Sequence, residues 1–179
     1  MTEITITKLD AARRQLKTAI ELYFSDGDPV AIHTLVFAAH EIIDNLLKAT
    51  GRKSRMFRPS SVRKDKRQTW AQILKRDANF FKHANNDLKS SIKFHPFSND
   101  FFFVHALSAL DEIGEPRSME GLAMSFWLRL RHPDLYTEEY PRSAYPINIL
   151  DRITERPQFF AMFQVFWKMG EFRSLAPGP

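Results

Sequence analysis

Two series of apolar residues recur at intervals of three to four positions in the first fifty residues. The first series is Leu9, Ala12, Leu16, Ala19, Ile20 and Tyr23. The second series is Ile32, Leu35, Val36, Ala39, Ile42, Ile43 and Leu46. This spacing places each series on one face of an amphipathic helix, and it therefore predicts two long helices near the N-terminus.

The residues around these series predict where the two helices begin and how they are joined. Thr7 followed by Asp10 matches a capping box, which predicts the start of the first helix. Asp28 followed by Pro29 is a favourable start for the second helix, because proline lacks the backbone donor that would go unpaired there. Only a few residues separate the two helices, so they must lie antiparallel as a helical hairpin.

Further helices follow, and no stretch gives a convincing sheet. The third helix is predicted over 62–85, with a core face of Trp70, Ile73, Leu74, Phe81 and Ala84. Later helices are predicted at 100–113, from Ser118 to just before Pro133, at 147–153 and at 157–169. Other stretches are predicted to be extended at 90–97, irregular at 136–146 and frayed at 174–179. The pattern therefore predicts an all-α helical bundle, built on the hairpin, in a single domain of residues 1–179.

The amino-acid composition limits the kinds of chemical site that the chain can form and indicates its cellular location. The chain has 179 residues, and 44% of them are hydrophobic, which is enough for a sizeable core in one domain. It contains no cysteine, which excludes disulfides, zinc–thiolate sites and thiol nucleophiles. The N-terminus lacks the pattern of a signal peptide, and the apolar run FFFVHALSAL is about half the roughly 20 residues of a membrane span. We therefore expect a cytoplasmic protein without a membrane partner.

The net charge of +5 is unevenly distributed along the chain. Eight basic residues fall within the connection 50–67: Arg52, Lys53, Arg55, Arg58, Arg63, Lys64, Lys66 and Arg67. Asp65 is the one acid among them, so 52–67 carries +7 and the rest of the chain −2. A basic patch on a near-neutral chain favours a polyanionic partner such as nucleic acid. The alternative is a solvated loop and helix start, because blocks of like charge are often only that.

Three polar residues interrupt the apolar stretch RDANFFKHAN at 76–85. At about 100° per residue, Arg76, Asn79 and His83 fall within about 60° of one another, beside the core face of the third helix. A histidine can transfer a proton near neutral pH, an arginine can hold a phosphate, and an asparagine can orient either one. These groups suit metal-independent RNA cleavage, although one histidine per chain means that two chains would have to share a site. The alternative is that His83 is a buried-edge residue bonded to a backbone carbonyl.

The same stretch carries a resemblance to a family. RDANFFKHAN, preceded by a helical hairpin, resembles the HEPN superfamily of all-helical domains, whose motif is an arginine, usually a polar residue, and a histidine four to six residues further on. Arg76, Asp77 and His83 fit the loose form of this motif, whereas Ala78 stands where the tighter form has its arginine. The resemblance implies that the motif helices of two protomers meet in one composite ribonuclease site.

A second resemblance covers about residues 7–105. KLDAARRQL, DPVAIHTLVFAAHEI and ANFFKHA in the first three helices look like a group of small bacterial proteins. This likeness implies no activity.

A second polar stripe lies on the second helix. His33, His40 and Asp44 fall within about 60° of one another at about 100° per residue. His40 and Asp44 are one turn apart and could reach one metal ion. However, metal sites in helical bundles usually carry several carboxylates and a Glu-x-x-His pair, which is absent from this chain. We therefore predict no metal, and expect hydrogen-bonded or interface histidines or a groove shared with His83.

Two functional hypotheses remain open, and neither needs a cofactor, because glycine-rich phosphate loops and dinucleotide fingerprints are absent. In the first, the chain is a HEPN-like homodimer that binds or cleaves RNA. Arg76 would hold phosphate, Asn79 would orient the groups, and His83 would act as acid or base in a metal-independent endoribonuclease, while 52–67 draws the RNA in. In the second, the chain is a non-catalytic helical interaction or dimerisation module with a protein partner.

Overall fold

The structure, a computed structural model, describes residues 2–52, 64–84, 88–133 and 147–172. Every regular element within these ranges is a helix. The elements are α1 (Lys8–Phe24), α2 (Pro29–Ala49), the 3-10 turn η1 (Lys64–Lys66), α3 (Arg67–Lys82), α4 (Ser98–Glu112), α5 (Met119–Arg131), α6 (Ile147–Leu150) and α7 (Arg156–Met169). The predicted all-α fold class is therefore confirmed.

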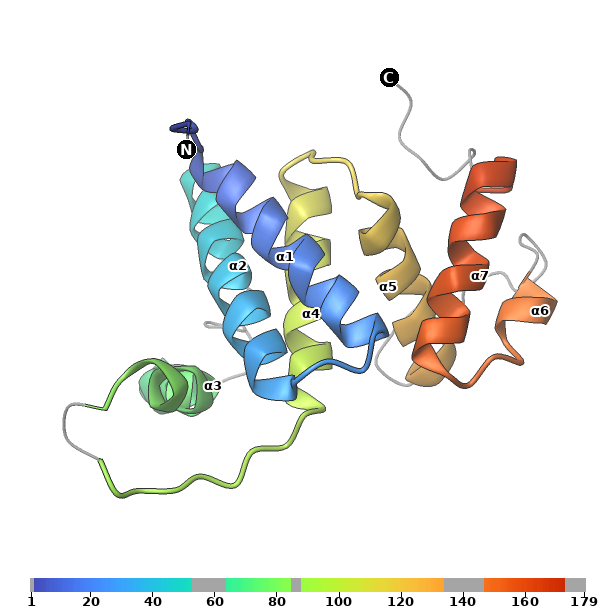
Figure 1. Cartoon of the computed structure of the whole chain (residues 1–179). Helices are drawn as coiled ribbons and strands as arrows, with labels where there is room; N and C mark the ends of the chain where they lie inside the picture. The colour runs from blue at the N-terminus through green and yellow to red at the C-terminus, as the bar shows by residue number, and fades with distance from the viewer. Residues whose placement is uncertain (1, 53–63, 85–87, 134–146, 173–179) are drawn as a thin grey trace.

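Helices α1 and α2 form the predicted hairpin and lie side by side (Figure 1). Thr7 and Asp10 form a reciprocal capping box. The Thr7 hydroxyl accepts from the Asp10 backbone N–H at 3.1 Å, and the Asp10 carboxylate accepts from the Thr7 backbone N–H at 3.1 Å. Asp28 Oδ1 accepts from the backbone N–H groups of Val30 and Ala31, both at 2.9 Å. These bonds satisfy donors that a helix leaves unpaired in its first turn, so both predicted starts are confirmed.

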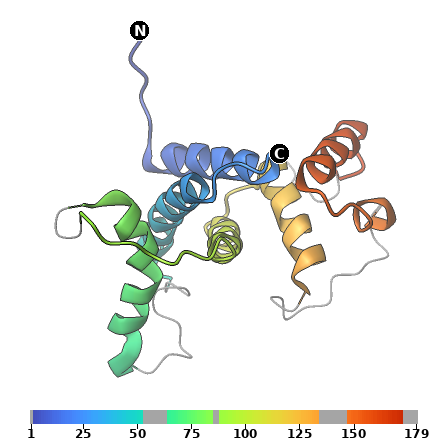
Figure 2. The same cartoon turned by 60° about the horizontal axis from the view of Figure 1, so that its bottom comes forward.

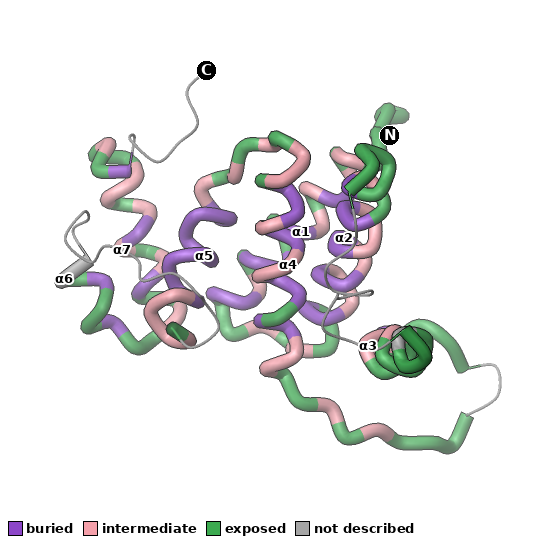
Figure 3. The backbone as a smooth tube through the Cα atoms, turned by 180° about the vertical axis from the view of Figure 1, so that it is seen from behind, coloured by how far each residue is buried: buried purple, intermediate pink, exposed green. Residues whose placement is uncertain are grey.

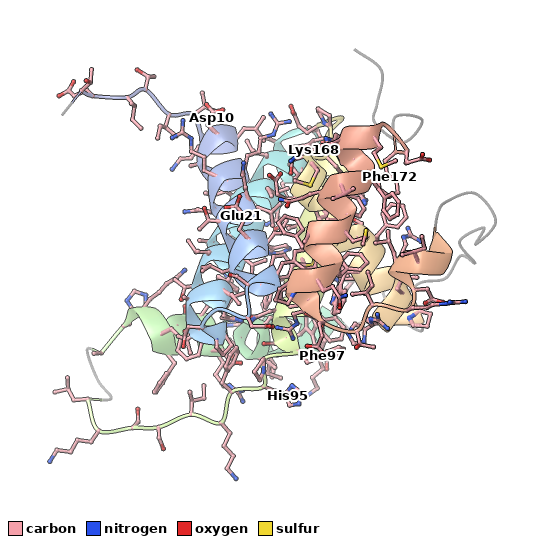
Figure 4. All side chains as sticks on the ribbon, turned by 45° about the vertical axis from the view of Figure 1, so that its right-hand side comes forward. Asp10, Glu21, His95, Phe97, Lys168 and Phe172 are labelled. Carbon is pink, nitrogen blue, oxygen red and sulfur yellow. The ribbon has the colours of Figure 1, made fainter. Side chains whose placement is uncertain are left out.

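The core lies between this hairpin and helices α4, α5 and α7 (Figure 3). Aromatic rings join α5 and α7 to the end of α1. Phe24 stacks on Phe160 with ring centroids 4.7 Å apart and meets Trp127 edge-on at 6.0 Å. Phe172, just after α7, stacks on Phe163 at 4.5 Å (Figure 4). Burying an apolar side chain of this size contributes about 1.5–3 kcal/mol, so these rings hold the two halves of the bundle together.

Helix α3 stands away from this body and packs on α2 by one narrow side (Figure 2). Ala78 is fully buried, and Ala71 and Leu74 are partly buried against the core. The predicted core face of this helix is wrong at Trp70 and Ile73, whose residues are 37% and 57% exposed. The small side chain of Ala78 lets the two helices approach along that side, and this leaves Trp70 and Ile73 on a flank.

Several predicted boundaries differ from the structure. Helix α3 ends at Lys82, so Ala84 lies beyond the helix and is exposed instead of contributing to the core. Residues 90–95 form neither helix nor strand, and α6 is a single turn that ends at Leu150. The third helix was predicted over 62–85, but in the described residues a 3-10 turn covers Lys64–Lys66 and α3 spans Arg67–Lys82. The irregular stretch 136–146 and the tail 174–179 lie outside the described residues.

Helix α2 also meets a simple criterion for a membrane span. Among the described residues, it is the one helix that is long and apolar enough to cross a membrane, judged by length and composition alone. Half of its most apolar window is buried inside the protein. Core helices pass the same test, so this property does not distinguish α2 from them.

Candidate nucleic-acid interface

The Arg76, Asn79 and His83 trio lies on the side of α3 that faces solvent. All three residues are exposed. At about 100° per residue, Arg76 lies roughly 160° and Asn79 roughly 100° round the helix from the buried Ala78. Arg76 and Asn79 therefore lie on exposed sides of α3, away from the buried Ala78, and the exposed His83 follows directly after the helix.

Arg76 carries its charge at the surface. Its Nε donates to Asp77 Oδ1 at 2.8 Å, and its side chain remains 61% exposed. An exposed ion pair of this kind contributes about 0–1 kcal/mol, so Asp77 is a weak competitor for the arginine. A guanidinium has five N–H donors, and one bond to Asp77 leaves others that can hold a phosphate.

His83 is the C-cap residue that directly follows α3. Its backbone N–H donates to the Asn79 carbonyl at 3.0 Å, while its own backbone is extended, with φ −129° and ψ 133°. The residue is exposed, so the prediction of a buried-edge histidine is wrong. An exposed imidazole can reach a substrate, which an acid–base role requires.

The basic segment predicted from the sequence is described only in part. Arg52, Lys64 and Lys66 are exposed, and Arg67 begins α3. The remaining predicted contacts lie outside the described residues; they are Lys53, Arg55, Arg58 and Arg63. The positive charge continues past Arg67: 52–97 contains 13 basic and 3 acidic residues, so it carries +10 and the rest of the chain −5. We call residues 52–97 the basic arm.

The described part of the basic arm presents its cations to solvent. Its exposed basic residues beyond Arg52 are Lys64, Lys66, Arg76, Lys82, Lys89 and Lys93. Lys75 differs, because its Nζ lies 2.7 Å from Glu41 Oε1 on α2. Lys75 thus ties α3 to the body, while the other described cations precede α3, lie on it or lie on the segment that leads to α4.

His33 is buried where α2 meets α3 and α4. Its Nδ1 lies 2.7 Å from Asn99 Oδ1, and Asn99 Nδ2 donates to the Pro29 carbonyl at 3.2 Å. Because Asn99 uses its amide group as the donor to Pro29, its Oδ1 accepts, and the His33 proton must sit on Nδ1. The rings of Phe81 and Phe94 meet the imidazole edge-on at 5.6 and 5.1 Å. Burial lowers the pKa of His33, and the expected hydrogen-bonded histidine is confirmed at this position.

His40 and Asp44 complete the second stripe and are also buried. The Phe102 ring lies 5.5 Å from the His40 ring, and burial lowers the pKa of His40 to about 4. Lys48 Nζ lies 2.6 Å from Asp44 Oδ2. In the part of the chain that the structure describes, no three His, Asp or Glu side chains are grouped to hold a metal ion. The stripe belongs to the core, so the predicted groove shared with the exposed His83 is wrong.

A polar cluster that no sequence pattern revealed joins α1, α4, α5 and α7. Asp100 is buried in the first turn of α4, and its Oδ2 lies 3.2 Å from His132 Nε2 at the end of α5. The Tyr23 hydroxyl bonds to Asp100 and accepts from Trp127 Nε1 at 3.1 Å. Arg156, at the start of α7, lies 4.1 Å from the centre of the Tyr23 ring. We call these five residues the polar join.

The polar join is made by residues that are distant in the sequence. Tyr23 and Trp127, for example, are 104 positions apart, so spacing within one helix could not bring them together. One residue of the cluster has a local signal in the sequence: His132 precedes Pro133, and the proline predicts the end of a helix there. Burial raises the pKa of Asp100 and of Tyr23, because the charged forms lose hydration. Since these groups bond one another across helices, we interpret the cluster as a structural connection.

Comparisons of the chain with models of protein families, with curated proteins and with solved structures found no match. The HEPN resemblance and the bacterial likeness therefore stay predictions. Function has to be inferred from the residues and their arrangement.

Proposed function

We propose that this protein binds RNA through the basic arm. The observation that carries the proposal is the separation of charge, with +10 on residues 52–97 and −5 on the rest of the chain. Cations that neutralise phosphates release condensed counterions, and this drives binding largely independently of base sequence. The acidic remainder repels the same phosphates, which directs a nucleic acid to the arm.

An exposed aromatic residue on the arm favours single-stranded RNA over a regular duplex as the partner. Trp70 lies on α3 between Lys66 and Arg76 in the sequence and is 37% exposed. Unpaired bases stack on aromatic side chains, and single-stranded RNA presents such bases in its loops and ends. Cations beside an aromatic ring are the combination that binding to single strands uses.

The catalytic form of this proposal uses the trio. Arg76 would hold the scissile phosphate, Asn79 would orient the reacting groups, and His83 would transfer the proton, as the HEPN resemblance implies. A homodimer would supply a second His83 and so both an acid and a base. Two arms of +10 repel each other, so we expect RNA lying between them to promote this pairing.

A second candidate is a non-catalytic interaction module with a protein partner. It is favoured by apolar side chains on the same arm, because Ile73 and Leu88 are 57% and 84% exposed. Exposed apolar side chains that form a patch mark contact with another chain. In this candidate the trio orders an interface, and the basic arm contacts an acidic protein.

The experiment that tests RNA binding is a salt titration of labelled mixed-sequence RNA, read by fluorescence anisotropy. Between about 50 and 200 mM salt, the affinity should fall at least about tenfold, because phosphate contacts release counterions. Lys89→Glu with Lys93→Glu should weaken binding and flatten the salt dependence. The matched control, Lys8→Glu with Lys168→Glu, reverses two exposed lysines outside the arm and should change binding little. Absent or salt-insensitive binding would reject the proposal and favour the interaction module.

Cleavage is tested separately from binding. The purified protein is incubated with mixed RNA in EDTA, beside His83→Ala and the control His95→Ala, which removes another exposed histidine of the arm. Cleavage that survives the chelator, disappears in His83→Ala and persists in His95→Ala would support a metal-independent ribonuclease. If the natural protein cleaves no more RNA than His83→Ala does, RNA binding would remain without catalysis by His83.

A further inference from the structure

A groove of about 370 Å³ lies between α1 and the start of α5, beside the connection from α4. That connection is at the end of the molecule away from α3 (Figure 1). Four apolar residues of its lining are buried: Leu16 and Ile20 from α1, and Leu107 and Leu110 from α4. The volume falls in the lower part of the range of small-ligand pockets, about 300–1,000 Å³. The groove is thus large enough for a small molecule with an apolar body.

All the charged residues that line this groove are basic. Arg13, Arg14 and Lys17 come from α1, and Arg117 comes from the connection before α5. Arg117 is held rigidly, because it donates to both carboxylate oxygens of Asp111 and to Ser125 Oγ. An apolar groove with an entirely basic lining has the chemistry of a site for an amphiphilic anion.

Two ion pairs beside the groove join α1 to the connection before α5 and to the first turn of α5. Arg13 Nη2 lies 2.6 Å from Glu115 Oε2, and Lys17 Nζ lies 3.2 Å from Glu120 Oε1. Neither acid is among the lining residues, so each cation is paired beside the groove and not within it. Arg14 makes no ion pair with any residue that the structure describes. Its electrostatic neighbour is Asp10, one turn earlier on α1, whose carboxylate bonds to Thr7, so Arg14 can bind an incoming anion without breaking an ion pair.

We propose that this groove binds a small amphiphilic carboxylate, with its apolar chain against Leu16, Ile20 and Leu107 and its carboxylate at Arg14. Glu115 and Glu120 pair with Arg13 and Lys17 and so offset two of the cations in the lining, which favours a small anion over a long polyanion. A cationic amphiphile would meet only like charges in the lining. The proposal does not depend on RNA binding.

The first test uses the natural full-length chain and a series of straight-chain carboxylates in isothermal titration calorimetry. From hexanoate to octanoate, the affinity should rise about fourfold for each added methylene, because each buried methylene gains about 0.8 kcal/mol. Decylammonium should bind at least tenfold more weakly than decanoate, and inorganic phosphate should not displace decanoate. No binding of decanoate, no gain with chain length, or equal binding of decylammonium would overturn the proposal.

The second test locates the site. Arg14→Glu should weaken decanoate binding about tenfold, and Lys89→Glu, the same charge reversal on the basic arm, should leave it unchanged. Arg14 is exposed, so circular dichroism should show an intact helical fold in this variant. Decanoate binding that is equal in Arg14→Glu and the natural chain would place the ligand elsewhere and overturn the assignment.

Discussion

At the scale of single residues, surroundings decide what each histidine can do. His83 lies at the exposed end of α3 and can meet a substrate. His33 and His40 are buried, and loss of hydration disfavours their protonated forms. The three are alike in the sequence pattern, since each falls on a polar stripe of a helix. Of these three histidines, only His83 therefore remains a candidate for acid–base chemistry.

The buried His40 makes stability depend on pH. Its pKa in the folded protein is about 4, against an ordinary value of 6.5. Between these values the unfolded chain binds a proton that the folded protein does not, so the free energy of unfolding falls as the pH falls from 6.5 to about 4. The effect is at most on the order of 3 kcal/mol. Urea unfolding at neutral pH and near pH 4 should show this loss, and His40→Phe should lose less than the natural protein.

The control for this prediction is His83→Ala, which removes an exposed histidine and should keep the natural dependence on pH. Carboxylates such as Asp100 titrate in all three proteins, so the difference between the proteins isolates the histidine. An equal loss in His40→Phe and in the natural chain would show that His40 is not the group responsible.

At the scale of elements, helices that carry their own start signals were predicted closely. Asp28 caps α2 with two backbone bonds, and Ser118 Oγ accepts from the Gly121 N–H at the start of α5. Helix α3 has no side-chain cap bond at its start, and its predicted core face was partly wrong. Local signals place a helix end, whereas the buried face depends on what packs against the helix.

The cap of α2 gives a prediction at this scale. Asp28→Ala removes the acceptor for two backbone N–H groups and should lower the free energy of unfolding by about 0.5–2 kcal/mol. Asp28→Asn is the matched control, because the asparagine side chain can still accept these bonds and should preserve most of the stability. Urea denaturation of the three proteins measures the effect. A loss in Asp28→Asn as large as in Asp28→Ala would argue that the charge matters, through the helix dipole, more than the cap bonds.

At the scale of the whole molecule, two features stand out: the contacts that join the helices of the bundle and the uneven distribution of charge. Aromatic rings and the polar join connect α1 and α4 to α5 and α7, and they involve residues from both halves of the sequence. Charge is divided between the basic arm, +10 over residues 52–97, and the rest of the chain, −5, and helix α3 of the arm stands away from the bundle (Figure 2). The contacts hold the bundle together, and the distribution of charge separates the RNA-binding surface that we propose from the core.

The polar join predicts coupling between Tyr23 and Asp100. Tyr23→Phe leaves Trp127 Nε1 without its acceptor and should cost about 1–3 kcal/mol of stability. In a double-mutant cycle with Asp100→Asn, the two changes should be non-additive by about 0.5–3 kcal/mol, because the groups share one network. The control cycle pairs Tyr23→Phe with His83→Ala, which lies outside the network and should be additive. Additivity in the first cycle would mean that the hydroxyl and the carboxyl act independently.

The candidate site was predicted in part. The sequence placed Arg76, Asn79 and His83 on one side of a helix, and in the structure all three are exposed, with His83 just beyond the end of α3. It also predicted a hydrogen-bonded His33, but not the partner Asn99, which is 66 positions away. The groove between α1 and the start of α5 and the polar join were not predicted, because each is assembled from several helices. Helical periodicity relates residues within one element and carries no information about which elements meet.

The sequence by itself determined the helical class, the starts of α1, α2 and α5, and the concentration of positive charge in 52–97. These features depend on local spacing, on capping side chains and on composition, all of which act over a few residues. The tertiary structure decided which faces are buried: Trp70 and Ile73 lie on the surface, and His33 and His40 lie in the core. It decided this because burial of a helix face follows from the neighbour that packs on it, and α3 has α2 on one narrow side, where Ala78 allows close approach.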